Sequence, residues 1–363
     1  ARRAVLLSLY AAVLATPSLD AQAARFDRGR MWTFERPPVA WFDEAYGVAA
    51  DSTWLARARL GALRIPGCSA SFVSPEGLVL TNHHCVRDRI TEVEREGEDL
   101  HAEGFAAGSR EEERPIEGFV AEQLLHAVDV TERIEDRVGG RSGPQRVERV
   151  VEERGEIREE LREEWGEEVS IEFVELFSGA RTSAYVWREF ADVRLVWAPE
   201  ETIGFFGGEV DNFEYPRYNL DAALLRIWEG EAPLESGPWF FELAEAGASE
   251  ADAVFVVGNP GSTTRYQTLE QLATRRDVVE PATLDFVADR ATILEEYSEA
   301  FPDEARAAGI DDDIFSARNS VKAIEGQLAG FSDEDVRARL EARERALVEL
   351  VAVDSLETAA LEV

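Results

Sequence analysis

The sequence predicts a mainly β fold with helices, consisting of one six-stranded or near six-stranded β-barrel followed by an incomplete α-helical domain. Short runs rich in β-branched and aromatic residues, separated by turn residues, recur between residues 69 and 257. One stretch between them, residues 146–166, has instead the three- and four-residue apolar spacing of an amphipathic helix. After residue 268 the strand pattern ends and helical patterns follow. These three observations predict the fold class.

The composition fits a globular protein and limits its partners. The chain has 363 residues, of which 45% are hydrophobic, enough for a sizeable core and for two or three domains. Its formal net charge is -35, because 73 acidic residues outnumber 38 basic ones. Nucleic acid and anionic membranes would repel such a chain, so we expect neither as a partner.

The first residues are typical of a secretory signal peptide. Arg2 and Arg3 precede an apolar run at residues 4–15, and Ala21-Gln22-Ala23 has the small-x-small pattern of a cleavage site. The apolar run is shorter than the ~20 residues that a membrane span needs. We therefore expect an exported bacterial protein that is periplasmic or on the cell surface.

Four segments follow from these patterns. They are the signal peptide (residues 1–23) and an N-terminal arm without regular pattern (24–66). A β-barrel domain follows (67–268), with an acidic helix inserted near 146–166, and then the incomplete helical domain (269–363). Glu and Arg fill the polar faces of the inserted helix, and we interpret them as a solvated surface rather than a binding site.

A hairpin is predicted just before the first two histidines. Residues 69–73 and 78–81 are strand-like and flank Ser74-Pro75-Glu76-Gly77. Proline at the second position and glycine at the fourth favour a type I turn. The hairpin therefore leads directly into Asn82-His83-His84-Cys85. Later strands are predicted at residues 171–177, 184–190, 193–198, 221–228 and 253–257.

The last segment is predicted to be a series of helices with an N-cap before the final one. Breaks are expected near Pro281, Pro302, Gly309 and Gly330. Ser332 is followed by two acidic residues and is predicted to cap the last helix.

The cysteines and the isolated histidines give no sign of a metal site. Cys68 and Cys85 are the only two cysteines, and in an oxidising compartment they can form a disulfide. They show no CxxC spacing, so zinc binding or redox catalysis is the less favoured alternative. His101 and His126 have no supporting ligand pattern. We expect no metal and no cofactor.

The segment around His84 indicates the chemistry of a serine hydrolase, which needs an imidazole base and a carboxylate that orients it. Thr81-Asn82-His83-His84-Cys85 resembles the chymotrypsin-type signature, in which the catalytic histidine directly precedes a disulfide cysteine. The resemblance implies a chymotrypsin-like barrel, His84 as the base and a bridge from Cys85 to Cys68. As neighbours on an extended segment, His83 and His84 would point to opposite sides and make a poor metal pair.

The carboxylate is expected from a later segment. Asp221-Ala222-Ala223-Leu224-Leu225 resembles the segment that carries the catalytic aspartate of trypsin-like peptidases. An aspartate ahead of a buried strand is also common as a turn residue. However, the order of His84 before Asp221 fits the chymotrypsin order, in which the serine comes last.

A wider resemblance links most of the chain to one family. Gly67-Cys68 and residues 31–32, 72–85, 207–217, 261–266 and 319–322 are similar to segments of the bacterial dipeptidyl-peptidase 7 and 11 family, and the similarity runs from about residue 29 to about residue 331. The resemblance implies a double β-barrel with a helical domain over the cleft. It also implies a serine-type enzyme that removes dipeptides from free peptide N-termini, with peptides as partners and a homodimer as a form of the full-length protein.

The same resemblance assigns a substrate-binding pair. In the family, an Asn-Trp pair helps to hold the α-amino group of the substrate, and here the pair is Asn212 and Phe213. An amide carbonyl can accept a hydrogen bond from an ammonium group, and phenylalanine offers a π face without the indole N–H. The alternative interpretation is a turn residue followed by a buried aromatic.

No serine in the sequence matches the glycine-rich turn that carries the family's nucleophile. Ser262 aligns with a different segment, and Ser236 follows Asp221 too closely for a second barrel to lie between them. We therefore expect the first barrel only, without the second barrel, as an N-terminal fragment that is inactive alone. The alternatives are a non-catalytic homologue that binds peptide N-termini or a partner protein, and an endopeptidase that uses one of the dismissed serines.

Overall fold

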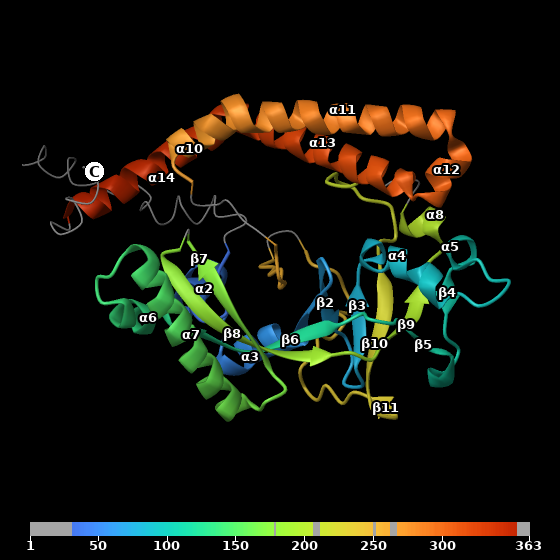
Figure 1. The fold of residues 1–363 in the computed structure, drawn as a ribbon, viewed down its shortest axis with the longest axis horizontal. Helices are drawn as coiled ribbons and strands as arrows, with labels where there is room; N and C mark the ends of the chain where they lie inside the picture. Colours follow the sequence, from blue (N-terminus) through green and yellow to red (C-terminus); the bar gives the residue numbers. More distant parts are fainter. Residues whose placement is uncertain (1–30, 178, 206–210, 250–251, 262–266, 354–363) are drawn as a thin grey trace, which may run out of the picture. The chain divides into compact units, whose positions relative to one another are not determined.

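A computed structural model describes residues 31–177, 179–205, 211–249, 252–261 and 267–353 of the chain (Figure 1). The predicted signal peptide, the motif residues 207–210 and Ser262 lie outside the described residues. Across the described parts of the chain, no helix is both long enough and apolar enough to cross a membrane.

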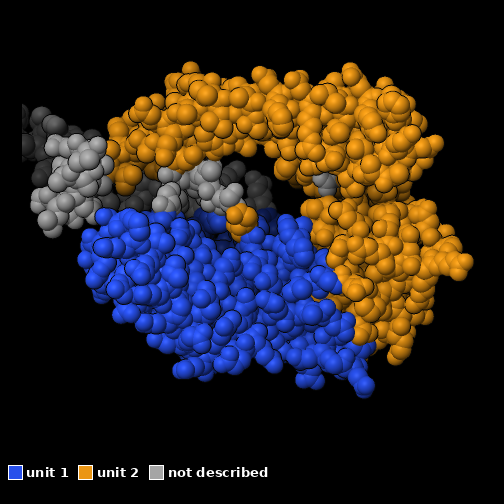
Figure 2. All heavy atoms as spheres, viewed as in Figure 1, with its two compact units in different colours: residues 1–79, 118–192, 227–259 blue, residues 80–117, 193–226, 260–363 orange. Residues whose placement is uncertain are grey.

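The chain forms two compact units, each assembled from three separate segments (Figure 2). The first unit comprises residues 1–79, 118–192 and 227–259, and the second comprises residues 80–117, 193–226 and 260–363. His84 and Asp221, the two predicted catalytic residues, come from different segments of the second unit. The helices after residue 268 belong to that unit as well.

The strands build a sheet. They are β1 (Ala62–Ile65), β2 (Cys68–Phe72), β3 (Leu78–Thr81), β4 (Phe105–Ala106), β5 (Arg114–Pro115), β6 (Ala121–Asp129), β7 (Ser170–Leu176), β8 (Arg181–Phe190), β9 (Val193–Ala198), β10 (Ala223–Glu229) and β11 (Ala232–Pro233). In this sheet β1 pairs antiparallel with β2 and β6, β8 with β6 and β7, β9 with β4 and β5, and β10 with β11. The order of the strands is β4-β9-β10-β3-β2-β1-β6-β8-β7, with β11 paired to β10 and β5 to β9. Within the described residues this order has two ends, so the predicted closed barrel is not observed.

The predicted hairpin is present as β2 and β3. The backbone N–H of Val73 donates to the carbonyl oxygen of Leu78 at 2.8 Å and closes the turn. Gly77 has a φ of +66°, and a Cβ at this position would lie 2.8 Å from the carbonyl oxygen of Ile227. Glycine is therefore required here both by the left-handed backbone and by the close approach of a neighbouring chain segment.

The arm predicted as irregular contains two helices, α2 (Val39–Tyr46) and α3 (Ser52–Gly61), so the sequence prediction was wrong there. Asp51 caps α3 by accepting a hydrogen bond from the backbone N–H of Trp54 at 2.8 Å. The helices are short, and their aromatic side chains pack against Phe255 rather than following an apolar stripe. A periodic signal was therefore missing from the sequence.

The contacts of Phe255 also explain why the strand predicted at residues 253–257 is wrong. No strand is present at these residues. The rings of Phe42, Tyr46 and Trp54 lie 5.0, 6.3 and 5.1 Å from the ring of Phe255. Side-chain packing in the first unit, rather than strand pairing, therefore accounts for the apolar run.

The inserted helix is confirmed as α7 (Gly143–Trp165), and it packs with α6 (Thr131–Val138) on the sheet of the first unit (Figure 1). Ile157 and Leu161 are buried in a cluster with Ala184 and Val186 of β8. The polar faces form ion pairs, as expected for a solvated surface. Glu153 is an exception, because it is buried and pairs with Arg133.

The helices of the second unit include four short ones near the strands and a longer series after residue 268 (Figure 1). The short ones are η1 (His83–Cys85), α4 (Arg87–Ile90), α5 (Leu100–Glu103) and α8 (Glu201–Gly204), and the series is α10 (Leu269–Thr274), η4 (Arg275–Val279), α11 (Glu280–Ala300), α12 (Pro302–Ala307), α13 (Ile310–Ser332) and α14 (Glu334–Val353). The one-turn helices η2 (Thr91–Val93) and η3 (Arg110–Glu112) also belong to this unit. Arg290 of α11 pairs with Asp313 of α13 at 2.7 Å.

Two of the expected helix breaks are observed, near Pro302 and at Gly309. The break expected near Pro281 is instead the π-helical turn η4, which leads directly into α11. Proline has no backbone N–H to donate, and a wider turn just before it accommodates this. α13 passes Gly330 and ends at Ser332, so Ser332 is not the predicted N-cap. Asp333 takes that place and accepts from the backbone N–H of Val336 at 3.0 Å.

Candidate active site

His84 follows strand β3 and lies in η1, a single turn of 3-10 helix rather than the expected extended segment. The turn still separates the two neighbouring imidazoles. His83 is 1% exposed, whereas the side chain of His84 is 45% exposed. Cys85, the next residue, and Cys68 are both disulfide-bonded, as predicted.

Asp221 lies two residues before β10, and both of its carboxylate oxygens bond to His84. Oδ2 accepts from Nδ1 of His84 at 2.8 Å, and Oδ1 accepts from the backbone N–H of His84 at 3.0 Å. The Asn82 side-chain amide adds hydrogen bonds to Oδ2 at 3.2 Å and to the Asp221 carbonyl oxygen at 3.0 Å. The structure therefore brings together the two residues that the motifs predicted as a catalytic pair.

The electrostatic environment keeps Asp221 ionised. Its side chain is only 6% exposed, and burial alone would raise the pKa of the carboxyl group. The hydrogen bonds from His84 and the nearby charge of Arg217 outweigh burial, so the pKa is lowered from its ordinary value. An ionised carboxylate on Nδ1 holds the proton of the neutral imidazole there and leaves Nε2 as the basic nitrogen.

The loop between residues 211 and 221 folds back on itself and is held by a buried aspartate. Oδ2 of Asp211 accepts from the backbone N–H groups of Tyr218 and Asn219 at 2.6 and 3.2 Å. Bonds from two backbone amides lower the pKa of Asp211. The fold of this loop returns Arg217 to the side of Asn212.

Arg217 connects Asn212 to Asp221. Its Nη1 donates to Oδ1 of Asn212 at 2.8 Å, and its Nη2 donates to Oδ2 of Asp221 at 3.1 Å. Oδ1 of Asn212 also accepts from the backbone N–H of Phe213 at 3.1 Å. Because both neighbours can only donate, the orientation of the Asn212 amide is fixed with its oxygen toward Arg217.

His84 and Phe213 line one pocket of about 680 Å³ in the second unit. The side chain of Phe213 is 68% exposed and its backbone φ is +62°, so it is not the buried aromatic of the alternative interpretation. The pocket-lining residues that the structure describes are His84, Arg87, Asp88, Phe205, Phe213, Gly309, Asp312, Asp313, Phe315, Ser316, Asn319, Ser320 and Ala323.

Sequence reasoning had not assigned a role to most of the pocket wall. Arg87 of α4 forms a close ion pair with Asp312 of α13, and its guanidinium lies 4.0 Å from the ring centre of Phe205. The Phe205 ring in turn packs 4.8 Å from that of Phe315. Only the Asn319 segment carried a signal, because it belongs to the residues 319–322 that resemble the family.

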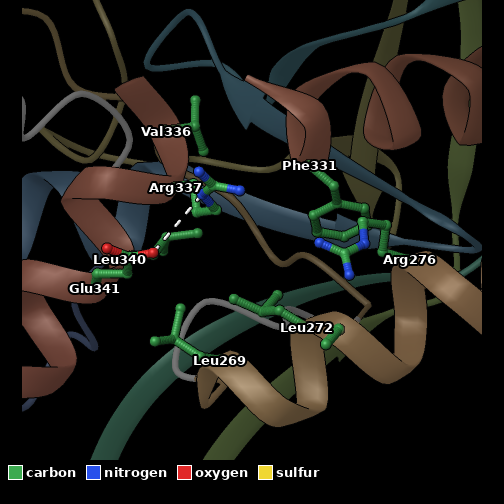
Figure 3. Close-up of a pocket in the computed structure, with 9 residues that line it drawn as sticks. Leu269, Leu272, Arg276, Phe331, Val336, Arg337, Leu340 and Glu341 are labelled. Atoms are coloured by element: carbon green, nitrogen blue, oxygen red, sulfur yellow. Dashed lines mark ion pairs between the residues drawn. The ribbon is translucent and has the colours of Figure 1, made fainter. Parts of the chain in front are cut away.

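A second pocket, of about 200 Å³, lies among α10, α14 and the end of α13 (Figure 3). Its wall is mostly aliphatic, and the ion pair of Arg337 and Glu341 at 3.7 Å lies beside it. None of the predicted site residues lines this pocket. His101 and His126 are also outside the His84 pocket, and His126 stacks on Trp165 with ring centres 5.2 Å apart.

Known proteins share this fold and parts of this sequence. The crystal structure of Porphyromonas endodontalis DPP11 in complex with the dipeptide Arg-Glu superposes with a TM-score of 0.73 over 89% of this chain and 49% of that chain, at 20% identity. The complex of the same protein with substrate gives a TM-score of 0.74 over 90% of this chain and 50% of that one. At such low identity the similarity shows a shared fold.

Curated sequences agree with the structural similarity. The dipeptidyl-peptidase 7 of Phocaeicola vulgatus is 31% identical over 224 residues, which are 58% of this chain and 31% of that protein. The Asp/Glu-specific dipeptidyl-peptidase of Shewanella putrefaciens is 27% identical over 348 residues, which are 92% of this chain and 47% of that protein. This chain therefore spans less than half the length of either relative.

The match to a defined family extends over nearly the whole chain. Residues 26–362 match peptidase S46, a range that includes the loop of Asn212 and Arg217, the His84 and Asp221 pair and the helices that line its pocket. The chain belongs to the peptidase S46 family.

Proposed function

We propose that the chain supplies the acid–base pair of a serine-type dipeptidyl-peptidase, which releases dipeptides from free peptide N-termini. The observation that carries this proposal is the 2.8 Å hydrogen bond between Nδ1 of His84 and Oδ2 of Asp221, beside a pocket that His84 and Phe213 share. His84 is then the general base and Asp221 the carboxylate that fixes its tautomer. Membership of the S46 family supports the assignment.

The chemical steps follow from this geometry. Nε2 of His84 takes the proton of a serine hydroxyl as its oxygen attacks the peptide carbonyl carbon, and Asp221 stabilises the imidazolium that forms. His84 then returns the proton to the leaving amine, which leaves an acyl-enzyme that water hydrolyses by the same base. We propose that the serine comes from a part of the full-length enzyme beyond this sequence.

Two serines of the pocket add to the alternative nucleophiles within the chain. Ser316 and Ser320 both lie on α13 and line the His84 pocket. The Ser320 hydroxyl donates to the carbonyl oxygen of Ser316 at 2.9 Å, a bond within the helix that disfavours a role as nucleophile. Labelling of this chain with a fluorophosphonate tests them, and we expect no labelled serine. Labelling that Ser316→Ala, Ser320→Ala or Ser262→Ala abolishes would place the nucleophile in the chain.

Recognition of the free N-terminus is assigned to the Phe213 side of the pocket. Among the described lining residues, the carboxylates of Asp88, Asp312 and Asp313 outnumber the single guanidinium of Arg87, which favours a cationic group. Phe213 offers a π face to an ammonium group. Asn212 is not among these lining residues, and its carbonyl oxygen already accepts two hydrogen bonds, so a substrate ammonium has to share this oxygen with Arg217.

The test of the proposed function compares substrates in the full-length gene product. A fluorogenic dipeptidyl substrate with a free amine should be cleaved with a kcat/KM at least ~100-fold above that of its N-acetylated form. His84→Ala and Asp221→Ala should remove turnover, whereas His126→Ala, outside the pocket, should retain it. Equal cleavage of both substrates would indicate an endopeptidase, and peptide binding without any turnover would indicate the non-catalytic homologue.

Export is the proposed setting of this activity. The disulfide-bonded state of Cys68 and Cys85 supports an oxidising compartment such as the periplasm or the cell surface.

A further inference from the structure

The Arg217 side chain makes three hydrogen bonds that link the loop of residues 211–221 to the acid–base pair. Besides the bonds to Asn212 and Asp221, its Nε donates to Oδ1 of Asn219. The Arg217 side chain is 31% exposed, so water only partly screens the charge of its guanidinium group. A planar guanidinium can serve three acceptors in fixed directions, which an ammonium group cannot do.

The position of this cation has an electrostatic consequence for His84. Arg217 and His84 donate to the same oxygen, Oδ2 of Asp221. A carboxylate that is shared with a permanent cation attracts a proton on the neighbouring imidazole less strongly. Arg217 therefore favours the unprotonated imidazole, which is the form that a general base needs before reaction.

The surrounding carboxylates act in the opposite direction. The charged groups that line the His84 pocket in the described residues are Arg87 and Asp88 of α4 and Asp312 and Asp313 of α13; Glu201 of α8 pairs with Arg87, and Asp221 and Arg217 complete the set. Carboxylates predominate in this set and in the chain as a whole, whose net charge is -35. Their combined potential favours protonated histidine.

We propose that Arg217 is a positioning residue that keeps His84 unprotonated in this acidic pocket and braces Asn212 at a fixed distance from the His84–Asp221 pair. This inference rests on the proposed function, in which His84 acts as the base and Asp221 as its carboxylate partner. A dipeptidyl-peptidase has to measure the distance from the N-terminus of the substrate to the bond that it cuts. A side chain that bonds both the loop of the amine site and the catalytic carboxylate holds this distance constant.

The test is a titration of His84 in this chain by NMR, with nitrogen-15 in the histidine rings. The four histidines are assigned by single substitutions, and the titration requires no nucleophile. In Arg217→Gln the pKa of His84 should rise by about one unit relative to the wild-type chain, because a cation beside Asp221 is lost. In Arg217→Lys, which retains the charge, it should return most of the way toward the wild-type value.

Two further variants separate this inference from the proposed function. Asp221→Asn should lower the pKa of His84 by about one unit or more, which tests the pair itself. Arg276→Gln removes a positive charge from the second pocket of the same unit. It should change the pKa of His84 by less than ~0.2 units at physiological salt. If Asp221→Asn has its effect while Arg217→Gln does not exceed the Arg276→Gln control, the role of Arg217 is refuted and the pair stands.

Folding of the variants is read from the other three histidines, whose titrations should stay as in the wild-type chain. If Arg217→Gln does not fold, Arg217→Met replaces it, since its unbranched apolar side chain takes the place of the aliphatic part of arginine without charge. A lysine variant with the same rise as the uncharged variant would overturn the electrostatic role.

Discussion

At the scale of residues, the two adjacent histidines have opposite environments. The ring of His83 is buried, and neither of its nitrogens has a hydrogen-bond partner among the described residues. Gly204 of α8 packs against it so closely that a Cβ at this position would lie 2.7 Å from the ring. The pair pattern in the sequence indicated that the two side chains point in different directions, and the choice of His84 as the base came from the cysteine that follows it.

The burial of His83 predicts a loss of stability in acid. Burial lowers the pKa of His83 to about 4 from an ordinary value of 6.5. The unfolded chain therefore binds more protons between these pH values, and the contribution of neutral His83, at most about 3 kcal/mol, is complete above pH 6.5 and is lost as the pH falls toward 4.

Urea unfolding of the wild-type chain and of His83→Phe at pH 7.5 and pH 5 measures this effect. The free energy of unfolding of the wild-type chain should fall more over this range, by about 2 kcal/mol, because phenylalanine does not titrate. The many carboxylates contribute equally to both proteins and cancel in the comparison. An identical fall in both proteins would refute the prediction.

Residue-level patterns predicted the candidate site in part. His84 and Asp221 were found because each lies in a short motif, and they prove to be hydrogen-bonded although they are 137 positions apart. Arg217 lies in the segment 207–217 that resembles the family, but no role was predicted for it. Its contacts depend on a loop that folds back through the backbone bonds of Asp211, and no local pattern encodes such a return.

At the scale of elements, segments with a strong local pattern were predicted well. The strands β7, β8 and β9 and the helix α7 lie within three residues of their predicted bounds, because the strands are dense in β-branched and aromatic residues and α7 repeats its apolar positions at helical spacing. The helices α2 and α3 were missed, since they are short and their packing comes from scattered aromatic rings.

The start of α14 gives a prediction about capping. Asp333 accepts from the backbone N–H groups of Asp335 and Val336 at 2.8 and 3.0 Å, whereas the Ser332 hydroxyl donates back to Leu328 at 3.1 Å. Asp333→Ala should therefore lower the free energy of unfolding by about 1 kcal/mol, and Ser332→Ala should leave it nearly unchanged. Thermal unfolding followed by circular dichroism measures both. A larger loss in the serine variant would reassign the cap.

At the scale of the whole molecule, the disulfide predicts that the free energy of unfolding depends on the redox state of the two cysteines. Titration of the denatured, unreduced chain should detect no free thiol, since Cys68 and Cys85 are bonded. Reduction should lower the free energy of unfolding by about 3 kcal/mol, because it releases a loop of fewer than about 20 residues in the unfolded chain. Urea unfolding with and without reductant measures the loss. Two reactive thiols in the unreduced chain would contradict the assignment.

The fold of the whole chain could be predicted only coarsely. Several strands and the helices after residue 268 were predicted, because β-branched and aromatic density or helical spacing marks them locally. The expected mainly β class is wrong, since the described residues lie more often in helices than in strands, and β6 was missed. The order of the strands and the assembly of each unit from three segments were not predicted. Both depend on pairings between residues far apart in the chain, which local patterns do not specify.

Because the second unit is assembled from separate segments of the chain, its parts become available at different times during synthesis on the ribosome. His84 is synthesised 137 residues before Asp221, and the wall of its pocket on α13 follows only after a further stretch of chain. During this interval the nascent chain carries an imidazole whose carboxylate partner does not yet exist. An unfinished polypeptide therefore cannot form this hydrogen-bonded pair before Asp221 has been synthesised.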